Sequence, residues 1–96
     1  MNLDEIFSCA FVKTTKAGDI LVIVDGIKVI FSVNVKFSIV SDIELKSTNY
    51  KLVCNISFDT RYGKVISTTC TGFKADKVRD YLQECFRERG VLYSPR

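Results

Sequence analysis

A stretch of alternating apolar and polar residues constrains the fold of this chain more than any other feature. In residues 27–39 every odd position is apolar, and the even positions are Lys, Ser or Asn at all sites except Ile30. Side chains in a β-strand point alternately to the two faces of a sheet. The pattern therefore predicts a strand with one buried face and one solvent-exposed face.

A tight turn precedes this strand. Asp25 and Gly26 are residue types that tolerate the positive φ required by a two-residue hairpin turn. Such a turn pairs positions 24, 22 and 20 with positions 27, 29 and 31. The apolar positions of both strands then share one face, so the turn chemistry and the apolar pattern predict the same hairpin.

Other segments also favour strands. Ile and Val together number 20, whereas Leu and Ala together number 9, a balance typical of sheet-rich chains. Residues 50–59 repeat the alternation, and a loop over residues 61–64 leads into a Thr-rich strand at 64–71. The polar residues 41–49 are interpreted as a connection that could also prolong the long strand.

The end of the chain changes to a helical period. Apolar residues recur at i, i+3, i+4, i+7 and i+8 from Val78 to Phe86, and Gly90 stands where a helix-ending glycine belongs. This predicts an amphipathic helix over about 74–89 and a tail over 91–96. Residues 3–15 fit either a helix or a strand, and we expect a short helix followed by a strand.

These elements predict a single α+β domain over residues 1–96. It has two layers: an antiparallel sheet of four or five strands, and a C-terminal amphipathic helix packed on one face. The expected strands include 19–24, 27–40, 50–59 and 64–71. The predicted core consists of Val29, Phe31, Val33, Val35, Phe37, Leu52, Ile56, Phe58, Val78, Leu82 and Phe86.

Targeting and cysteine patterns indicate the environment that we expect for the chain. No apolar run reaches 18 residues, and the first residues include Asp4 and Glu5 where a signal peptide would be basic. We therefore predict a cytoplasmic protein with no membrane association.

The four cysteines at positions 9, 54, 70 and 85 form no C-x-x-C pair, so we interpret them as buried, reduced thiols.

The composition disfavours catalysis. The chain contains no histidine, which removes the commonest general base and most zinc sites. Asp25, Glu44 and Lys46 have the residue types of a metal-dependent nuclease half-site, but Asp25 is already explained by the turn. We predict no catalytic residue, no bound metal and no cofactor.

Positive charge is concentrated in the second half of the chain. Residues 1–48 carry 5 basic and 6 acidic side chains, net −1, whereas residues 49–96 carry 9 basic and 5 acidic, net +4. The candidate binding residues are Arg61, Tyr62, Lys64, Lys74, Lys77, Arg79, Arg87 and Arg89, with Arg96 in the tail. Carboxylates at 76, 80, 84 and 88 have the spacing to pair with the helix cations, so a self-paired, solvated face is the competing interpretation.

Two functions follow as hypotheses. The first is a non-enzymatic protein-interaction module, a small inhibitor or regulator that occupies the surface of a larger protein partner. The alternative is a nucleic-acid-binding protein that uses the basic C-terminal half. The long strand extends about seven residues beyond its hairpin partner, which also predicts a homodimer, or pairing with a target, through a sheet edge.

Overall fold

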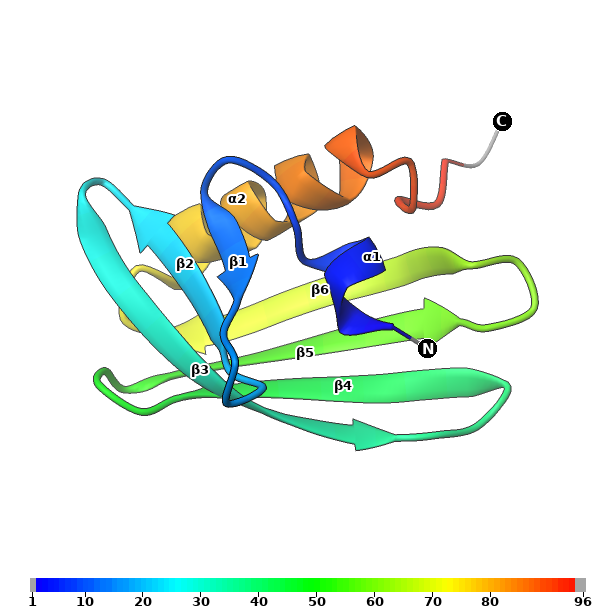
Figure 1. The fold of residues 1–96 in the computed structure, drawn as a ribbon, viewed down its shortest axis with the longest axis horizontal. Coiled ribbons are helices and arrows are strands. Elements are labelled where there is room, and N and C mark those ends of the chain that lie inside the picture. Colours follow the sequence, from blue (N-terminus) through cyan, green and yellow to red (C-terminus); the bar gives the residue numbers. More distant parts are fainter. Residues whose placement is uncertain (1, 95–96) are drawn as a thin grey trace.

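Six antiparallel strands and two helices make up the fold (Figure 1). The computed structural model describes residues 2–94. The strands lie in the sheet in chain order. The elements are α1 (Leu3–Ile6), β1 (Val12–Thr14), β2 (Ile20–Val24), β3 (Ile27–Lys36), β4 (Val40–Ser47), β5 (Leu52–Asp59), β6 (Lys64–Gly72) and α2 (Ala75–Glu88). The α+β class and the antiparallel sheet are confirmed, but the sheet has more strands than the predicted four or five.

The β2–β3 hairpin has the predicted register. Positions 20, 22 and 24 pair with 31, 29 and 27. Asp25 has a φ of 52° and Gly26 a φ of 78°, so both central residues of the turn adopt the left-handed conformation that this hairpin requires. The N-terminal segment also follows the expectation of a short helix and then a strand. The Asn2 side chain caps α1 by accepting a hydrogen bond from the Asp4 amide at 3.0 Å.

The predicted strand over 27–40 is wrong in its last four residues. The strand ends at Lys36, the chain turns at residues 37–39, and the segment interpreted as a polar connection is strand β4. Ser41 occupies an inward position of β4 and is buried, and its hydroxyl holds the turn by contacting the backbone of Ser38 at 3.2 and 3.3 Å. A serine at an inward position hid the alternation that identifies a strand.

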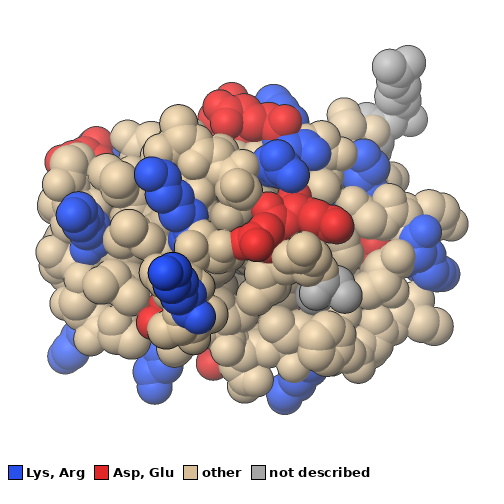
Figure 2. Space-filling view, in the orientation of Figure 1, with Lys and Arg blue, Asp and Glu red and all other residues tan. Residues whose placement is uncertain are grey.

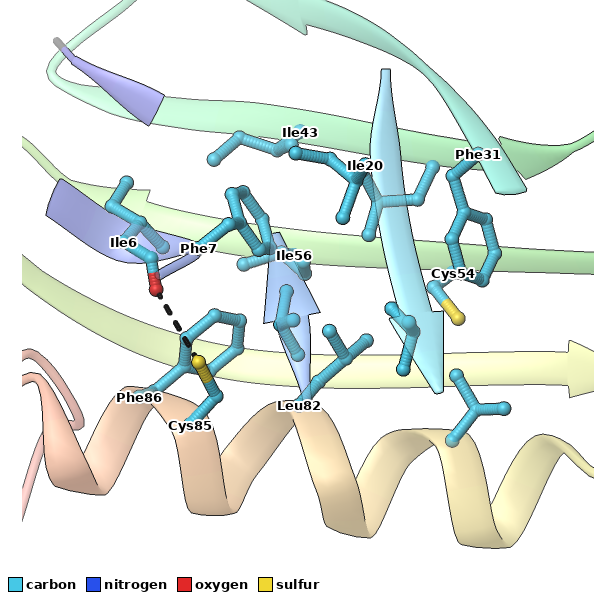
Figure 3. Packing of buried hydrophobic residues seen from close by; sticks show 14 of the residues in the cluster. Ile6, Phe7, Ile20, Phe31, Ile43, Cys54, Ile56, Leu82, Cys85 and Phe86 are labelled. Carbon is cyan, nitrogen blue, oxygen red and sulfur yellow. Dashed lines mark hydrogen bonds between the residues drawn. The ribbon is translucent and has the colours of Figure 1, made fainter. Parts of the chain in front are cut away.

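The sheet is curled, and α2 packs against it. Strand β3 pairs with β2 through residues 27–31 and with β4 through residues 31–36. Only Phe31 pairs with both neighbours, and the sheet curls along this strand. Helix α2 contacts β6, β2 and β5. Figure 3 shows Leu82 and Phe86 of α2 pointing toward Ile56 of β5 and toward Phe7, which follows α1. The rings of Phe7 and Phe86 meet edge to face with centroids 5.5 Å apart.

The buried core confirms most of the predicted set, with three exceptions. Phe37 is 72% exposed, because the chain has left the strand before this residue and places it in the β3–β4 turn. Val33 and Val35 are only half-buried. The confirmed core residues are Val29, Phe31, Leu52, Ile56, Phe58, Val78, Leu82 and Phe86.

The interpretation of the cysteines as reduced thiols is also wrong. Disulfides join Cys9 to Cys85 and Cys54 to Cys70. Cys54 and Cys70 are direct cross-strand neighbours of the β5–β6 hairpin, with Cα atoms 4.0 Å apart. The register next to the loop, with Asp59 opposite Lys64, would place Cys54 opposite Thr69, and an irregularity between Ser57 and Phe58 shifts the pairing so that Cys54 meets Cys70. The Cys9–Cys85 bond depends on the packing of α2 beside the N-terminal segment, which no sequence spacing reveals.

Candidate interaction surface at the loop end of the sheet

The predicted basic residues do not form one patch. Lys74, Lys77 and Arg79 lie at the start of α2. Arg87 and Arg89 lie at the other end of the helix, at least about 12 Å along its axis from Arg79 at 1.5 Å per residue. Arg61 and Lys64 lie in the β5–β6 loop and at the start of β6. Figure 2 shows that Lys and Arg side chains on the visible face are separated by uncharged and acidic surface. Arg96 lies outside the described residues.

The cations at the start of α2 are paired with carboxylates. The Lys77 ammonium lies 2.8 Å from the Asp25 carboxylate, and Lys74 lies 3.7 Å from the same oxygen. The hydrogen bond from Lys77 lowers the pKa of Asp25 below its ordinary value, and the same contact raises the pKa of Lys77. Arg79 pairs with Asp76 at 3.7 Å and with Asp80 at 3.4 Å. This cluster therefore joins α2 to the β2–β3 turn.

Arg61 contacts groups within the β5–β6 loop, and Lys64 contacts the residue that follows α2. Arg61 makes hydrogen bonds of 3.2 and 2.9 Å to the two oxygens of Asp59, and this contact lowers the pKa of Asp59 and raises that of Arg61. The Arg61 guanidinium also lies 5.4 Å from the centre of the Tyr62 ring. Lys64 donates to the carbonyl of Gly90, just beyond α2, at 2.6 Å.

The last two candidate residues, Arg87 and Arg89, also contact groups of the same chain. Arg87 pairs with Glu84 one helical turn earlier. Arg89 donates from Nε to the carbonyl of Glu5 at 3.1 Å, which ties the end of α2 to α1. Each of the seven candidate cations thus has a carboxylate or carbonyl partner within the chain. This supports the self-paired interpretation of the charged face.

Exposed apolar side chains gather instead at one end of the sheet. Among the described residues, six of the seven exposed large apolar side chains belong to the β3–β4 turn, the β5–β6 hairpin or the tail after α2. Figure 1 shows both turns and this tail at the same end of the molecule. We call this surface the loop end and define it by Phe37, Ile39, Val40, Tyr62, Ile66 and Tyr93.

Backbone hydrogen bonds join the parts of the loop end. The Thr60 amide and hydroxyl both donate to the Ile39 carbonyl, at 3.0 and 2.9 Å, which ties the β5–β6 loop to the β3–β4 turn. The tail runs parallel to the start of β6: the Val65 amide donates to Val91 at 2.6 Å, and the Tyr93 amide donates to Val65 at 2.9 Å. The exposed apolar side chains therefore stand on a connected backbone.

The loop end includes an open hollow of about 830 Å³. Tyr62, Ile66, Leu92 and Tyr93 supply its apolar lining, and Asp59 and Lys64 are among its polar residues. The sequence analysis selected Tyr62 and Lys64 as binding residues. It did not select the other five residues of the loop end, which are Phe37, Ile39, Val40, Ile66 and Tyr93. The adjacent apolar residues Ile39 and Val40 break the alternation, and this break was the available signal that the strand ends before them.

The nuclease-like combination does not assemble. Asp25 lies in the β2–β3 turn, whereas Glu44 pairs with Asn34 in the second half of β3. Seven residues of β3 separate Ile27, next to the turn, from Asn34, or roughly 23 Å of strand. Among residues 2–94 no three His, Cys, Asp or Glu side chains are grouped as metal ligands, and no helix there is long and apolar enough to span a bilayer.

Comparisons of the chain with protein-family models, curated proteins and solved structures found no match. The geometry of the loop end and of the charged residues is therefore the basis on which a function is inferred.

Proposed function

We propose that this protein is a non-enzymatic protein-interaction module, a small inhibitor or regulator that covers a surface of a larger protein partner with its loop end. The observation that carries the proposal is the concentration of six exposed apolar side chains on two adjoining turns and a tail. Contiguous exposed apolar surface on a soluble domain marks an interaction site more often than scattered apolar residues do.

The loop end also suggests the chemistry of the partner. Phe37 and Tyr62 are exposed by 72% and 73%, so they are the anchors with the most area to bury. The Lys64 ammonium has a carbonyl partner but no carboxylate partner among the described ion pairs. A partner with an apolar centre and an acidic group near Lys64 would complement this surface, with one of its side chains in the hollow.

Nucleic-acid binding remains the alternative. Phosphates would have to replace the existing partners of Arg61, Lys77 and Arg79, because these cations already contact carboxylates. The cytoplasmic location also remains a proposal. Trapping free thiols by alkylation in intact host cells tests it, because disulfides persist mainly in oxidising compartments.

A matched pair of variants tests the interaction function. The double variant Phe37→Ser/Ile39→Ser removes two apolar groups from the loop end, whereas the control Phe73→Ser removes an exposed ring from the opposite end of β6. Tagged proteins are used to capture partners from host extract, with and without nuclease. We expect a nuclease-resistant protein that wild type and Phe73→Ser retain and the double variant loses.

Salt adds a second readout to this experiment. An apolar interface should change little between about 50 and 200 mM salt, whereas phosphate contacts weaken steeply over that range. A captured component that disappears with nuclease or over this salt range would contradict the proposal. Equal capture by wild type and the double variant would also contradict it.

A further inference from the structure

Strand β3 has an open edge along its second half. Its first half pairs with β2, but β2 begins opposite Phe31, and only β4 pairs with the residues that follow. Figure 1 shows β3 continuing alongside β4 past the start of β2. Among the described strands, none occupies the β2 side of residues 32–36.

The hydrogen-bonding alternation identifies the groups on this edge. The two-residue turn makes Val24 and Ile27 a hydrogen-bonded pair, so odd residues of β3 point their N–H and C=O groups toward the β2 side. Even residues point toward β4, as the bond from the Thr48 amide to the Ile30 carbonyl at 2.9 Å confirms. Val33 and Val35 therefore present two N–H and two C=O groups along the open edge.

The protein caps the corresponding gap in the first half of β3. On the β4 side, the Asn49 side chain donates to the Lys28 carbonyl at 3.0 Å and accepts from the Ile30 amide at 3.2 Å. This side chain replaces a strand neighbour. The edge beside Val33 and Val35 has no comparable cap among the described side-chain hydrogen bonds.

The open segment has the length and symmetry for pairing with itself. It ends at Phe31, where β2 begins, and at the 37–39 turn, so five residues, or roughly 16 Å of strand, fit between these limits. An antiparallel pair centred on Asn34 places Val33 opposite Val35 of the second copy. Ser32 then faces Lys36 of the second copy, so no like charges are opposed.

We propose that a second copy of this chain occupies the β3 edge, with residues 32–36 of both copies paired antiparallel about a two-fold axis through Asn34. Val33 and Val35 of each copy would then form four intermolecular backbone hydrogen bonds. Their half-buried side chains would lie side by side on the inner face of a continuous sheet. The proposal is independent of the loop end, which contributes none of these hydrogen bonds.

Cysteine crosslinking tests the register of this pairing. In Asn34→Cys the two new thiols would face each other in a non-hydrogen-bonded pair, where Cα atoms are about 4.5 Å apart. In the control Ser32→Cys they would be offset by four residues, roughly 13 Å. Under mild oxidation we expect a covalent dimer of Asn34→Cys at a rate at least tenfold above that of Ser32→Cys. Equal rates would overturn the register.

Light scattering tests the dimer itself. We expect twice the monomer mass for wild type at micromolar concentration. Val35→Pro should give the monomer mass, because proline removes an outward N–H but none of the ladder bonds between β3 and β4. Its far-ultraviolet circular dichroism and cooperative melting serve as the folding check. A wild type that stays monomeric at high concentration, or a folded Val35→Pro that stays dimeric, would overturn the proposal.

Discussion

Gly72, the last residue of β6, permits the closest backbone approach around any glycine of the chain. Its φ is +118°, and an added Cβ would collide with the Lys51 carbonyl oxygen and lie 2.9 Å from the carbonyl carbon. Gly63 also has a positive φ, but a Cβ there would have open space within 4 Å. The two glycines therefore separate the cost of an unfavourable φ from the cost of a backbone collision.

We predict that Gly72→Ala destabilises the fold far more than Gly63→Ala does. The left-handed conformation alone costs a non-glycine residue about 1–2 kcal/mol, which sets the expected loss at Gly63. The collision at Gly72 should add about 2 kcal/mol or more. Urea unfolding of both variants measures the difference, and similar losses would show that β6 can move away from Lys51 at little cost.

The contact between Asp25 and Lys77 makes stability depend on pH in a defined direction. Because the folded-state pKa of Asp25 is below 3.8, its contribution is complete above that value and is lost as pH falls through the lowered pKa. The raised pKa of Lys77 acts in the opposite direction, since its contribution is complete below 10.5 and is lost as pH rises beyond that value.

We predict that Lys77→Met reduces the loss of stability between about pH 5 and pH 2 relative to wild type. Lys13→Met is the control, because Lys13 makes no ion pair among the described residues. Chemical unfolding across this pH range provides the measurement. If Lys77→Met and the control lose stability in parallel with wild type, the contact between α2 and the β2–β3 turn contributes nothing in solution.

At the scale of elements, the two disulfides close chain loops of very different length. The Cys9–Cys85 bond joins residues 76 positions apart and ties the N-terminal segment to α2. The Cys54–Cys70 bond joins residues 16 apart within a single hairpin that the ladder already holds. The longer connection should restrict the unfolded chain more.

We predict that Cys9→Ala lowers the free energy of unfolding more than Cys70→Ala does. Loop-closure entropy suggests losses of roughly 4.5 and 3 kcal/mol, respectively. Both positions are half-buried, so the packing changes are comparable. Urea unfolding with and without reductant compares the two variants. A larger loss for Cys70→Ala, or unchanged stability of reduced wild type, would contradict this ranking.

At the scale of the whole molecule, the arrangement of charge differs from what the net charge of +3 suggests. The cations lie at two ends of α2 and contact groups of the same chain, among them Asp25, Asp59 and the Gly90 carbonyl. Lys74 and Lys77 join the start of α2 to the β2–β3 turn, and Lys64 joins β6 to the residue after α2. This leaves no continuous basic surface among the candidate residues.

We therefore predict weak binding to nucleic acid. Because the candidate cations already contact groups of the chain, the Kd should lie at or above about 100 μM, the weak end of the range for non-specific binding. Fluorescence anisotropy with a random-sequence DNA duplex should then show no saturable binding at roughly 150 mM salt and 10 μM protein. A control with Lys64→Ala should behave in the same way. Saturable binding that weakens steeply with salt and is lost in Lys64→Ala would favour the alternative function.

Several features of this protein could be predicted from the sequence because neighbouring residues decide them. The β2–β3 register depends on Asp25 and Gly26, whose positive φ values are a local property of the turn. The helix depends on apolar spacing between Val78 and Phe86, and both of these residues are buried. The predicted cations are also where the helix and loop assignments place them, so the sequence determined their elements.

Only the tertiary structure decided which faces are covered and which distant groups meet. Alternation assigned Phe37 to the inward face, but it does not report where the strand ends, and the turn leaves this ring in solvent. The pairing of Cys9 with Cys85 and the contact of Lys77 with Asp25 depend on how α2 lies against the curled sheet. The loop end exists because hydrogen bonds bring together turns that are remote in sequence, and local pattern carries no information about such contacts.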